Sequence, residues 1–280
     1  LAVVGDTPNQ TKLVDQEGIE GTTAGGWPNT GHTSAIYGVA VDDQGYVYGS
    51  TWDYVRKLAP DGTEVTAGGW PFFKGDEGWI YAVAVDDEGY VYTGSRDDSA
   101  VRKLAPDGTQ VWEFTVADAV TAVVVDDAGQ VAAGISDGTV HKLDPNGNEI
   151  ETDGSPFAQV GGDADDLAVD DEGYVYTGSR DDTVRKFAPD GTQEWSFYGH
   201  SDNVYAVAVD DQGYVYSGSA DGDVHKIAPD GAEVAGSWPF RGHSDWVFAI
   251  AVDDQGNIYT GSQDRSVYKL APDGSEFWRY

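Results

Sequence analysis

The sequence predicts an all-β fold, a single β-propeller built from four-stranded antiparallel blades. The first observation is a repeated phrase that consists of an apolar run, Val-Asp-Asp, a glycine and an aromatic-rich run. Its copies are spaced 44, 40, 44, 40 and 43 residues apart and have their Val-Asp-Asp at Val41, Val85, Val125, Val169, Val209 and Val252. A period of about 40–45 residues is typical of propeller blades. The second observation is that each period holds four short runs separated by turn residues, as a four-stranded blade requires.

One copy of the repeat shows how the elements follow one another. Residues 204–209 are continuously apolar, which predicts an inner strand buried on both faces. Residues 210–213 supply a turn, 214–219 a second strand, 220–223 a second turn and 224–227 a third strand. A third turn at 228–231 leads to a more variable fourth strand around 233–234.

The number of copies sets the expected number of blades. Six full copies run from about residue 35 to residue 280, and residues 1–34 contain a partial copy without an inner strand. We therefore expect one domain over residues 1–280, a seven-bladed propeller with an incomplete first blade. A six-bladed propeller is the alternative. The chain opens at Leu1 instead of methionine, as a chain with a removed leader or a fragment would.

The composition excludes several classes of partner. The chain has 16 Lys and Arg against 49 Asp and Glu, so its formal net charge is −33. Such a surface repels the phosphates of nucleic acids and of anionic membranes, and no stretch approaches the roughly 20 apolar residues of a membrane span. The 9 Trp, 16 Tyr and 9 Phe in regular repeats are not typical of a disordered acidic chain. Because a carboxylate-covered surface stays soluble when salt screens its charges, we interpret the chain as a protein of a halophile.

Short motifs around the repeat resemble known propeller families. Gly31-His32, Gly199-His200 and Gly242-His243, with Ser219 and Asp221, resemble the WD-repeat family. The family's Trp-Asp would fall at Ile227-Ala228. Because this tryptophan is missing, the sequence departs from the family's Asp-His-Ser-Trp hydrogen-bond network. The phrase AVAVDDxGYVY is similar to NHL-type repeats and APDGTxxW to quinoprotein-type repeats. The resemblance implies a propeller and no particular activity; no residue set here suits a quinone, and we expect no cofactor.

Turn order distributes the polar residues over two sets of loops. The turns after the first and third strands receive the Asp-Asp pairs, which we interpret as turn and solvation residues without a bound metal. The turns after the second strand and the links between blades receive arginine and tryptophan, the residues that interface hot spots favour. This predicted binding surface comprises Trp52, Trp79, Trp246, Arg96, Arg180 and Arg265.

Two aspartates interrupt one inner strand. Asp165 and Asp166 stand where another copy has Tyr81 and Ala82, so we add them to the predicted binding surface near the mouth of the channel. Propeller glycosidases need a positioned acid and base, and only this one site is identifiable. Seven of the eight lysines share one third-strand position and are expected to pair with carboxylates.

These observations predict a non-catalytic recognition or scaffold protein of a halophilic archaeon or its virus. Its expected partner is a protein or a surface glycan, within a larger assembly, and its expected location is the cell surface, the extracellular space or a virion. The alternatives are a glycan-binding lectin and a polysaccharide-processing enzyme that acts at the channel mouth around Asp166.

Overall fold

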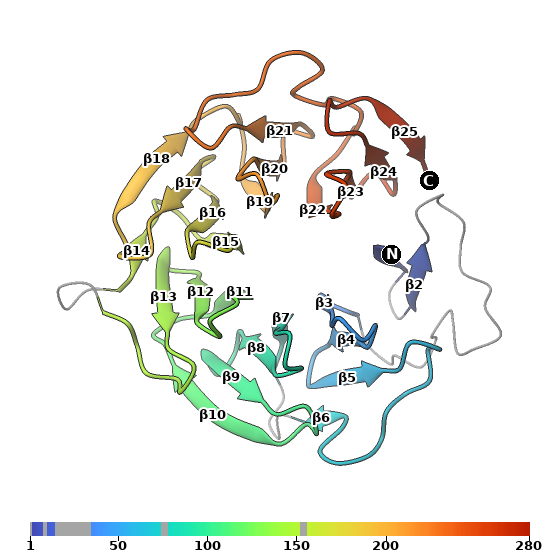
Figure 1. Ribbon diagram of the computed structural model, residues 1–280, viewed down its shortest axis with the longest axis vertical. Helices are drawn as coiled ribbons and strands as arrows, with labels where there is room; N and C mark the ends of the chain where they lie inside the picture. The colour runs from blue at the N-terminus through green and yellow to red at the C-terminus, as the bar shows by residue number, and fades with distance from the viewer. Residues whose placement is uncertain (1, 8–9, 15–34, 74–77, 152–155) are drawn as a thin grey trace. The chain divides into compact units, whose positions relative to one another are not determined.

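The computed structural model describes residues 2–7, 10–14, 35–73, 78–151 and 156–280, and every regular element in these ranges is a β-strand. The chain divides into two compact units, which comprise residues 1–133 with 143–149 and residues 134–142 with 150–280. The blades are meanders in which antiparallel strands pair in chain order (Figure 1). The fold is therefore the predicted β-propeller of antiparallel blades.

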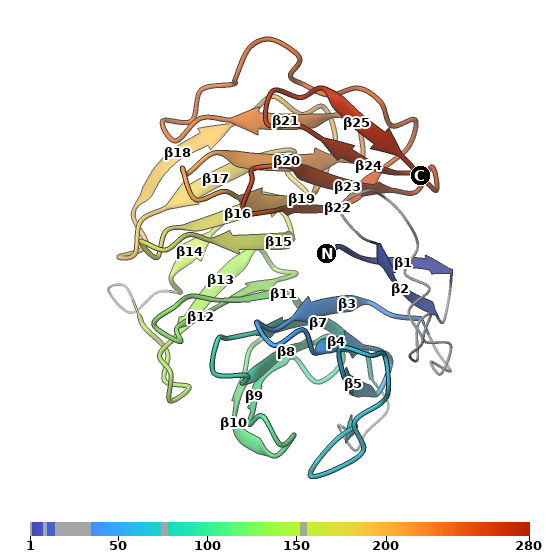
Figure 2. The ribbon, with the colours of Figure 1, turned by 45° about the vertical axis from the view of Figure 1, so that its right-hand side comes forward.

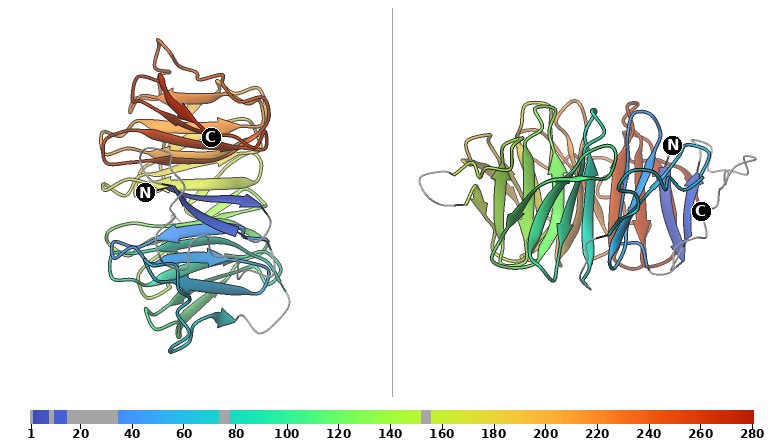
Figure 3. Two further views of the ribbon diagram at one scale, coloured as in Figure 1. Left: turned by 90° about the vertical axis from the view of Figure 1, so that its right-hand side faces the viewer. Right: turned by 90° about the horizontal axis from the view of Figure 1, so that it is seen from below.

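The first unit contains two complete blades of antiparallel strands, which are coloured blue to green in Figure 3. One has strands β3 (Gly38–Val41), β4 (Val47–Ser50), β5 (Tyr54–Leu58) and β6 (Phe72–Phe73). The next has strands β7 (Ile80–Val85), β8 (Val91–Ser95), β9 (Ala100–Leu104) and β10 (Gln110–Thr115). The boundary between the units falls within the following blade, which has strands β11 (Val120–Val125), β12 (Val131–Ile135), β13 (Thr139–Leu143) and β14 (Ala158–Gln159).

The second unit contains three further blades (Figure 2). The first has strands β15 (Ala164–Val169), β16 (Val175–Ser179), β17 (Val184–Phe187) and β18 (Gln193–Phe197). The second has β19 (Val204–Val209), β20 (Val215–Ser219) and β21 (Val224–Ile227). The third has β22 (Val247–Val252), β23 (Ile258–Ser262), β24 (Val267–Leu270) and β25 (Glu276–Arg279). In the β19–β21 blade, isolated bridges from Val224 to Phe240 and from Ile227 to Glu233 replace a fourth strand.

The blade count matches the six-bladed alternative, and the expected seventh blade is not confirmed. The strands β1 (Ala2–Thr7) and β2 (Gln10–Val14) form a separate two-stranded sheet. They correspond to the second and third strands of a repeat, but the described residues provide no inner or outer partner for them. The predicted fourth strand of this partial copy and His32 lie outside the described residues.

The first aspartate of each Asp-Asp pair holds its turn together. Asp210 Oδ1 accepts the backbone N–H groups of Gln212 and Tyr214, and its Oδ2 accepts the hydroxyl of the fully buried Tyr216 at 3.0 Å. The same pattern recurs at Asp42, Asp86, Asp170 and Asp253. The second aspartate, such as Asp211, is exposed. The prediction that these pairs serve turns is therefore confirmed for the first aspartate. The solvation role of the exposed second aspartate stays a prediction.

The buried tyrosine of the second strand is covered by a tryptophan and a lysine. The ring of Trp195 lies 6.1 Å from that of Tyr176, and the ammonium of Lys186 lies 5.4 Å from the same Tyr176 ring and 4.0 Å from Tyr174. Lys186 reaches this place because it pairs with Tyr176 across β16 and β17. The expectation that these lysines pair with carboxylates is therefore wrong for Lys186, since its closest described contacts are aromatic rings. Equivalent lysine–tyrosine contacts occur at Lys57, Lys103, Lys226 and Lys269.

Neighbouring blades approach closely at the glycine of the second strand. A Cβ atom on Gly94 would lie 2.5 Å from Val120 Cγ1 of the next inner strand, and one on Gly218 would lie 2.6 Å from Val247 Cγ1. Only glycine therefore permits this packing, because a side chain there would displace the neighbouring blade. The close contact holds the start of the neighbouring inner strands at Val120 and Val247. The candidate site lies at this end of the inner strands.

Candidate functional site

The inner strands of four blades carry a β-bulge near their first residue. In β19, Val204 pairs with Ser219 and Ala206 with Gly218, so Tyr205 is the extra residue. The equivalent extra residues are Tyr81 in β7, Asp165 in β15 and Phe248 in β22. A bulge re-aims the side chain of its extra residue. Three bulges thus carry an aromatic ring, and one carries a carboxylate.

In the first unit the bulge brings together Tyr37, Trp79 and Tyr81, which we call the first triad. The ring of Tyr37 lies 5.8 Å from Trp79 and 5.1 Å from Tyr81, and Trp79 lies 5.6 Å from Tyr81. Trp52 extends the group, with its ring edge-on to Trp79 at 5.5 Å. Trp52 is 43% exposed, so these rings form an aromatic surface open to solvent.

Arg96 covers the first triad. Its guanidinium carbon lies 4.8 Å from the Trp79 ring centre and 5.7 Å from that of Tyr81, and its Nη1 donates to the Tyr81 hydroxyl at 3.2 Å. Its backbone N–H donates to the Trp79 carbonyl at 2.8 Å. The structure therefore brings together three of the residues predicted from sequence, namely Trp52, Trp79 and Arg96.

In the second unit the same arrangement unites Tyr205, Trp246 and Phe248, which we call the second triad. Tyr205 lies 5.6 Å from Trp246 and 5.1 Å from Phe248, and Trp246 lies 5.7 Å from Phe248. Trp246 is 41% exposed and Phe248 48% exposed. The side-chain amide of Asn203 donates to the Tyr205 hydroxyl at 3.3 Å.

Arg180 occupies the position of Arg96 in its own blade but has acidic partners. It forms ion pairs with Asp163 at 3.0 Å and with Asp165 at 2.8 Å. Burial raises the pKa of Asp165 despite the hydrogen bond from Arg180, and that hydrogen bond raises the pKa of Arg180. Two predicted residues, Arg180 and Asp165, are thus joined as an ion pair on the bulge.

Asp166 has a different environment from Asp165. Its carboxylate accepts the backbone N–H of Val207 in the neighbouring strand β19 at 2.9 Å. Burial between these strands raises the pKa of Asp166 to about 7. Its oxygen is therefore engaged by backbone, and Asp165 is engaged by Arg180, so the two carboxylates do not form an acid–base pair.

Arg265 lies in the turn between β23 and β24 of the second unit. It is exposed, has a φ of 71°, and donates its backbone N–H to the Ser262 carbonyl at 3.1 Å. No described aromatic ring or carboxylate contacts its guanidinium. The structure therefore leaves Arg265 on the surface, in the same turn as Gln263, whose backbone N–H donates to the Trp246 carbonyl.

The sequence analysis missed four aromatic members of the triads, Tyr37, Tyr81, Tyr205 and Phe248. A signal for them exists, because each stands four residues before the valine of a Val-Asp-Asp copy. Within a continuous apolar run these aromatic residues read as core. The bulge, which depends on the pairing register of two strands, re-aims Tyr81, Tyr205 and Phe248, whereas Tyr37 directly precedes β3.

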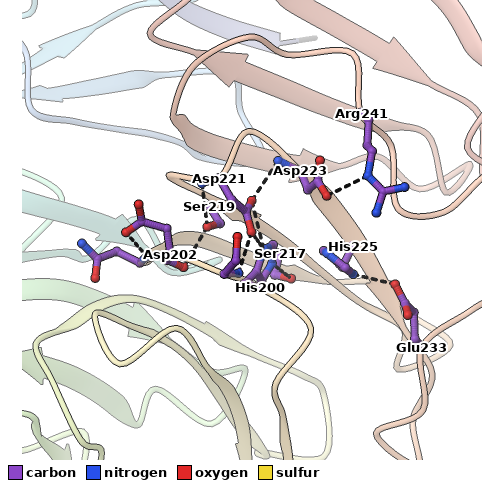
Figure 4. Close-up of polar contacts among 11 residues, drawn as sticks. His200, Asp202, Ser217, Ser219, Asp221, Asp223, His225, Glu233 and Arg241 are labelled. Carbon is purple, nitrogen blue, oxygen red and sulfur yellow. Dashed lines mark hydrogen bonds and ion pairs between the residues drawn. The ribbon is translucent and has the colours of Figure 1, made fainter.

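Two histidines form networks that resemble a catalytic triad in their contacts. His200 Nε2 lies 2.8 Å from Ser217 Oγ, and its Nδ1 lies 3.1 Å from an Asp221 oxygen (Figure 4). His243 has the same relation to Thr260 at 2.8 Å and to Asp264 at 3.1 Å. The side chains of His200 and His243 have no exposed surface, and Ser217 is fully buried.

The burial of these networks assigns them a structural task. A serine nucleophile must reach its substrate, whereas Ser217 lies inside the blade. Burial tends to raise the pKa of Asp221, but the hydrogen bonds from His200 and from backbone N–H groups lower it overall. Burial lowers the pKa of His243. The two described Gly-His histidines are therefore structural hydrogen-bonders at the links between blades.

The part of the chain that the structure describes contains no group of three or more His, Asp or Glu side chains suited to hold a metal ion. It also contains no helix that could span a bilayer. A pocket in the first unit is lined by acidic turn residues together with Lys103 and Pro145; these acidic residues are Asp86, Asp87, Glu88, Asp126 and Asp127.

Comparison with known proteins agrees with this geometry. The WD40 family, described as "WD domain, G-beta repeat", matches residues 191–226 and 229–268. The crystal structure of the computationally designed Ika8 protein is similar with a TM-score of 0.74 and 21% identity, and the match covers 99% of this chain and 83% of that one. The WD40 β-propeller domain of Doa1 is similar with a TM-score of 0.73 and 22% identity, over 89% of this chain and 83% of that one. No curated protein matches the chain in sequence. The chain is a β-propeller, and two of its segments, residues 191–226 and 229–268, are similar to the WD40 repeat.

Proposed function

We propose that this propeller is a non-catalytic recognition or scaffold protein that binds a protein partner through its aromatic triads. The observation that carries the proposal is the exposure of aromatic rings grouped around bulges of the inner strands, with Arg96 over the first triad. Tryptophan, tyrosine and arginine are the residues that contribute most energy to protein interfaces. A large exposed aromatic group on a soluble protein marks an interaction surface.

The setting that we propose is a halophile, at its cell surface or on a virus particle. The support is the net charge of −33 and the exposure of the second aspartate in the Asp-Asp turns. These exposed residues are Asp43, Asp87, Asp127, Asp171, Asp211 and Asp254. At molar salt their mutual repulsion is screened within about 3 Å.

The enzyme alternative has less support than the binding proposal. A glycosidase requires two carboxyl groups placed on either side of the scissile bond. Asp166 is held by the Val207 N–H, and Asp165 is paired with Arg180. A lectin remains a second outcome of the test below, because aromatic rings also receive sugars.

The test measures the dependence of partner capture on the triads. The wild-type protein and the double variant Trp52→Asp with Trp246→Asn are used as bait in molar KCl. The introduced residues, aspartate and asparagine, occur in the corresponding loops of other blades, at Asp97 and at Asn203. A matched control, Asp87→Ala with Asp211→Ala, changes exposed residues in the turns after the first strand. We expect capture to be lost in the tryptophan variant and kept in the control, with unchanged melting temperatures. Equal capture by both variants contradicts the proposal, and binding to a glycan array alone favours a lectin.

A further inference from the structure

The two triads differ in one residue that sits above them. The first residue of the turn after the second strand donates its N–H to a carbonyl two residues before the bulge. This bond is 2.8 Å from Arg96 to Trp79 and 2.9 Å from Gln263 to Trp246. Arg96 and Gln263 are therefore structurally equivalent, each above the bulge of its own blade. The first triad has an arginine at this position, and the second has an uncharged amide.

The first triad shows which chemical group this ring arrangement accepts. The Arg96 guanidinium lies over the Trp79 and Tyr81 rings and donates to the Tyr81 hydroxyl. A planar guanidinium suits such a site because it stacks on aromatic faces and is more weakly hydrated than an ammonium. The chain thus supplies its own occupant for the first triad.

The second triad has the same form, but no cationic side chain of the described residues occupies it. Its three ring distances, 5.6, 5.1 and 5.7 Å, match the 5.8, 5.1 and 5.6 Å of the first triad. Within the described ranges, no lysine or arginine lies over the rings of Tyr205, Trp246 or Phe248. Trp246 and Phe248 consequently keep 41% and 48% of their surface exposed.

The charges around the second triad favour a cation. Asp245 precedes Trp246 and accepts its backbone N–H, and Asp202 precedes Asn203, which donates to Tyr205. Arg180, whose charge interacts with Tyr205, is itself ion-paired with both Asp163 and Asp165. The neighbouring carboxylates therefore favour a cation, as does the net charge of −33 on the chain.

We propose that the second triad, Tyr205, Trp246 and Phe248, receives an arginine side chain from a protein partner, in the place that Arg96 fills in the first triad. This inference rests on the proposed function and names the chemistry of its partner. Stacking on aromatic rings also suits a protein in concentrated salt, because contacts between exposed charges are screened there, whereas ring burial is not weakened.

The test uses defined peptides in place of the unidentified partner. The peptide acetyl-Gly-Ser-Arg-Ser-Gly-amide is titrated into the whole chain in molar KCl and followed by saturation-transfer NMR. Two further peptides carry citrulline, the neutral isostere of arginine, or lysine at the central position. We expect the arginine peptide to bind at least tenfold more tightly than either of the others, which corresponds to about 1.4 kcal/mol.

Two reciprocal substitutions locate the binding. Gln263→Arg should place an internal guanidinium on the second triad and weaken peptide binding at least tenfold. Arg96→Gln should uncover the first triad and raise the stoichiometry from one peptide to two. Phe248→Ala, at a half-exposed residue, provides a second loss-of-binding variant if Gln263→Arg folds poorly.

The outcomes separate this inference from the proposed function. Equal binding of the arginine and citrulline peptides, equal or tighter binding of the lysine peptide, or binding that neither Gln263→Arg nor Phe248→Ala weakens would overturn the inference. If partner capture depends on Trp246 while the arginine peptide does not bind, the proposed function stands and the inference fails. If capture is also independent of the triads, both fail.

Discussion

The two residues of an Asp-Asp turn should differ sharply in their effect on stability. Asp210 accepts two backbone N–H groups and the hydroxyl of the buried Tyr216, whereas Asp211 is exposed. A hydrogen bond to a charged group contributes about 1.5–3 kcal/mol, and a buried hydroxyl left unpaired costs about 1–3 kcal/mol. We therefore expect Asp210→Ala to lower the free energy of unfolding by about 3 kcal/mol and Tyr216→Phe by about 1.5–2 kcal/mol. Asp211→Ala should stay within about 0.5 kcal/mol of the wild type.

The assay is urea unfolding followed by tryptophan fluorescence at about 2 M KCl, where long-range repulsion is screened. The β11–β14 blade offers an internal control, because Asp126 accepts the N–H groups of Ala128 and Gln130 but Ala132 stands where other blades have the tyrosine. Asp126→Ala should therefore cost less than Asp210→Ala. Equal losses from Asp210→Ala and Asp211→Ala, or no loss from Tyr216→Phe, would refute the assignment of the turn to its first aspartate.

Two further predictions concern charge. The melting temperature should rise steeply with KCl concentration, because salt screens the repulsion between carboxylates. At about 0.05 M salt it should recover in part as the pH falls toward 4.5, because protonation removes the same repulsion. A melting temperature that does not change between about 0.05 and 3 M salt contradicts this prediction. Asp166→Asn should stabilise the protein at pH 8 but not near pH 4.5. Burial raises the Asp166 pKa from 3.8 to about 7, so the folded state of the wild type loses stability as the pH rises between these values. An equal gain at both pH values, measured by urea unfolding, would show that the effect does not come from ionisation.

Much of the blade could be predicted because each repeat contains apolar runs at regular spacing, which indicate strands, and turn-forming residues between them. The predicted strands at 204–209 and 224–227 coincide with β19 (Val204–Val209) and β21 (Val224–Ile227). The predicted fourth strand around 233–234 is an isolated bridge between Ile227 and Glu233, since the following segment returns to pair at Phe240. Variable outer segments carry no repeated pattern from which their pairing could be inferred.

The candidate site could be predicted only in part. Tryptophan and arginine in loops are visible as residue types, so Trp52, Trp79 and Arg96 were assigned to one surface and lie together. Tyr205 and Phe248 stand in apolar strands, and the sequence pattern contains no sign of the bulge that exposes them. Pairing register is a property of two strands, so a pattern along one strand does not specify it.

The lysines show a similar limit. Because the chain is rich in Asp and Glu, its composition suggests that each lysine ammonium pairs with a carboxylate. Cross-strand neighbours are set by register, however, and register places Lys226 opposite Tyr216, with its ammonium 4.4 Å from the Tyr214 ring. Its ammonium also donates to the Pro272 carbonyl of the next blade at 3.0 Å. Burial lowers the pKa of this lysine, and nearby carboxylates oppose that shift.

The carboxylates of this protein therefore form two populations with different tasks. The two that hold histidine, Asp221 and Asp264, have a pKa lowered by hydrogen bonds, although burial opposes the shift. A carboxyl group whose pKa is lowered in the folded state stabilises the fold above its unfolded value, and this contribution is lost only as the pH falls through the folded pKa. These groups remain ionised near pH 4.5. Exposed residues such as Asp87 and Asp211 make no such contacts among the described residues, so they can be solvated without altering the blades. The second position of each turn can consequently carry a negative charge without affecting the fold, because the first aspartate makes the hydrogen bonds that hold the turn.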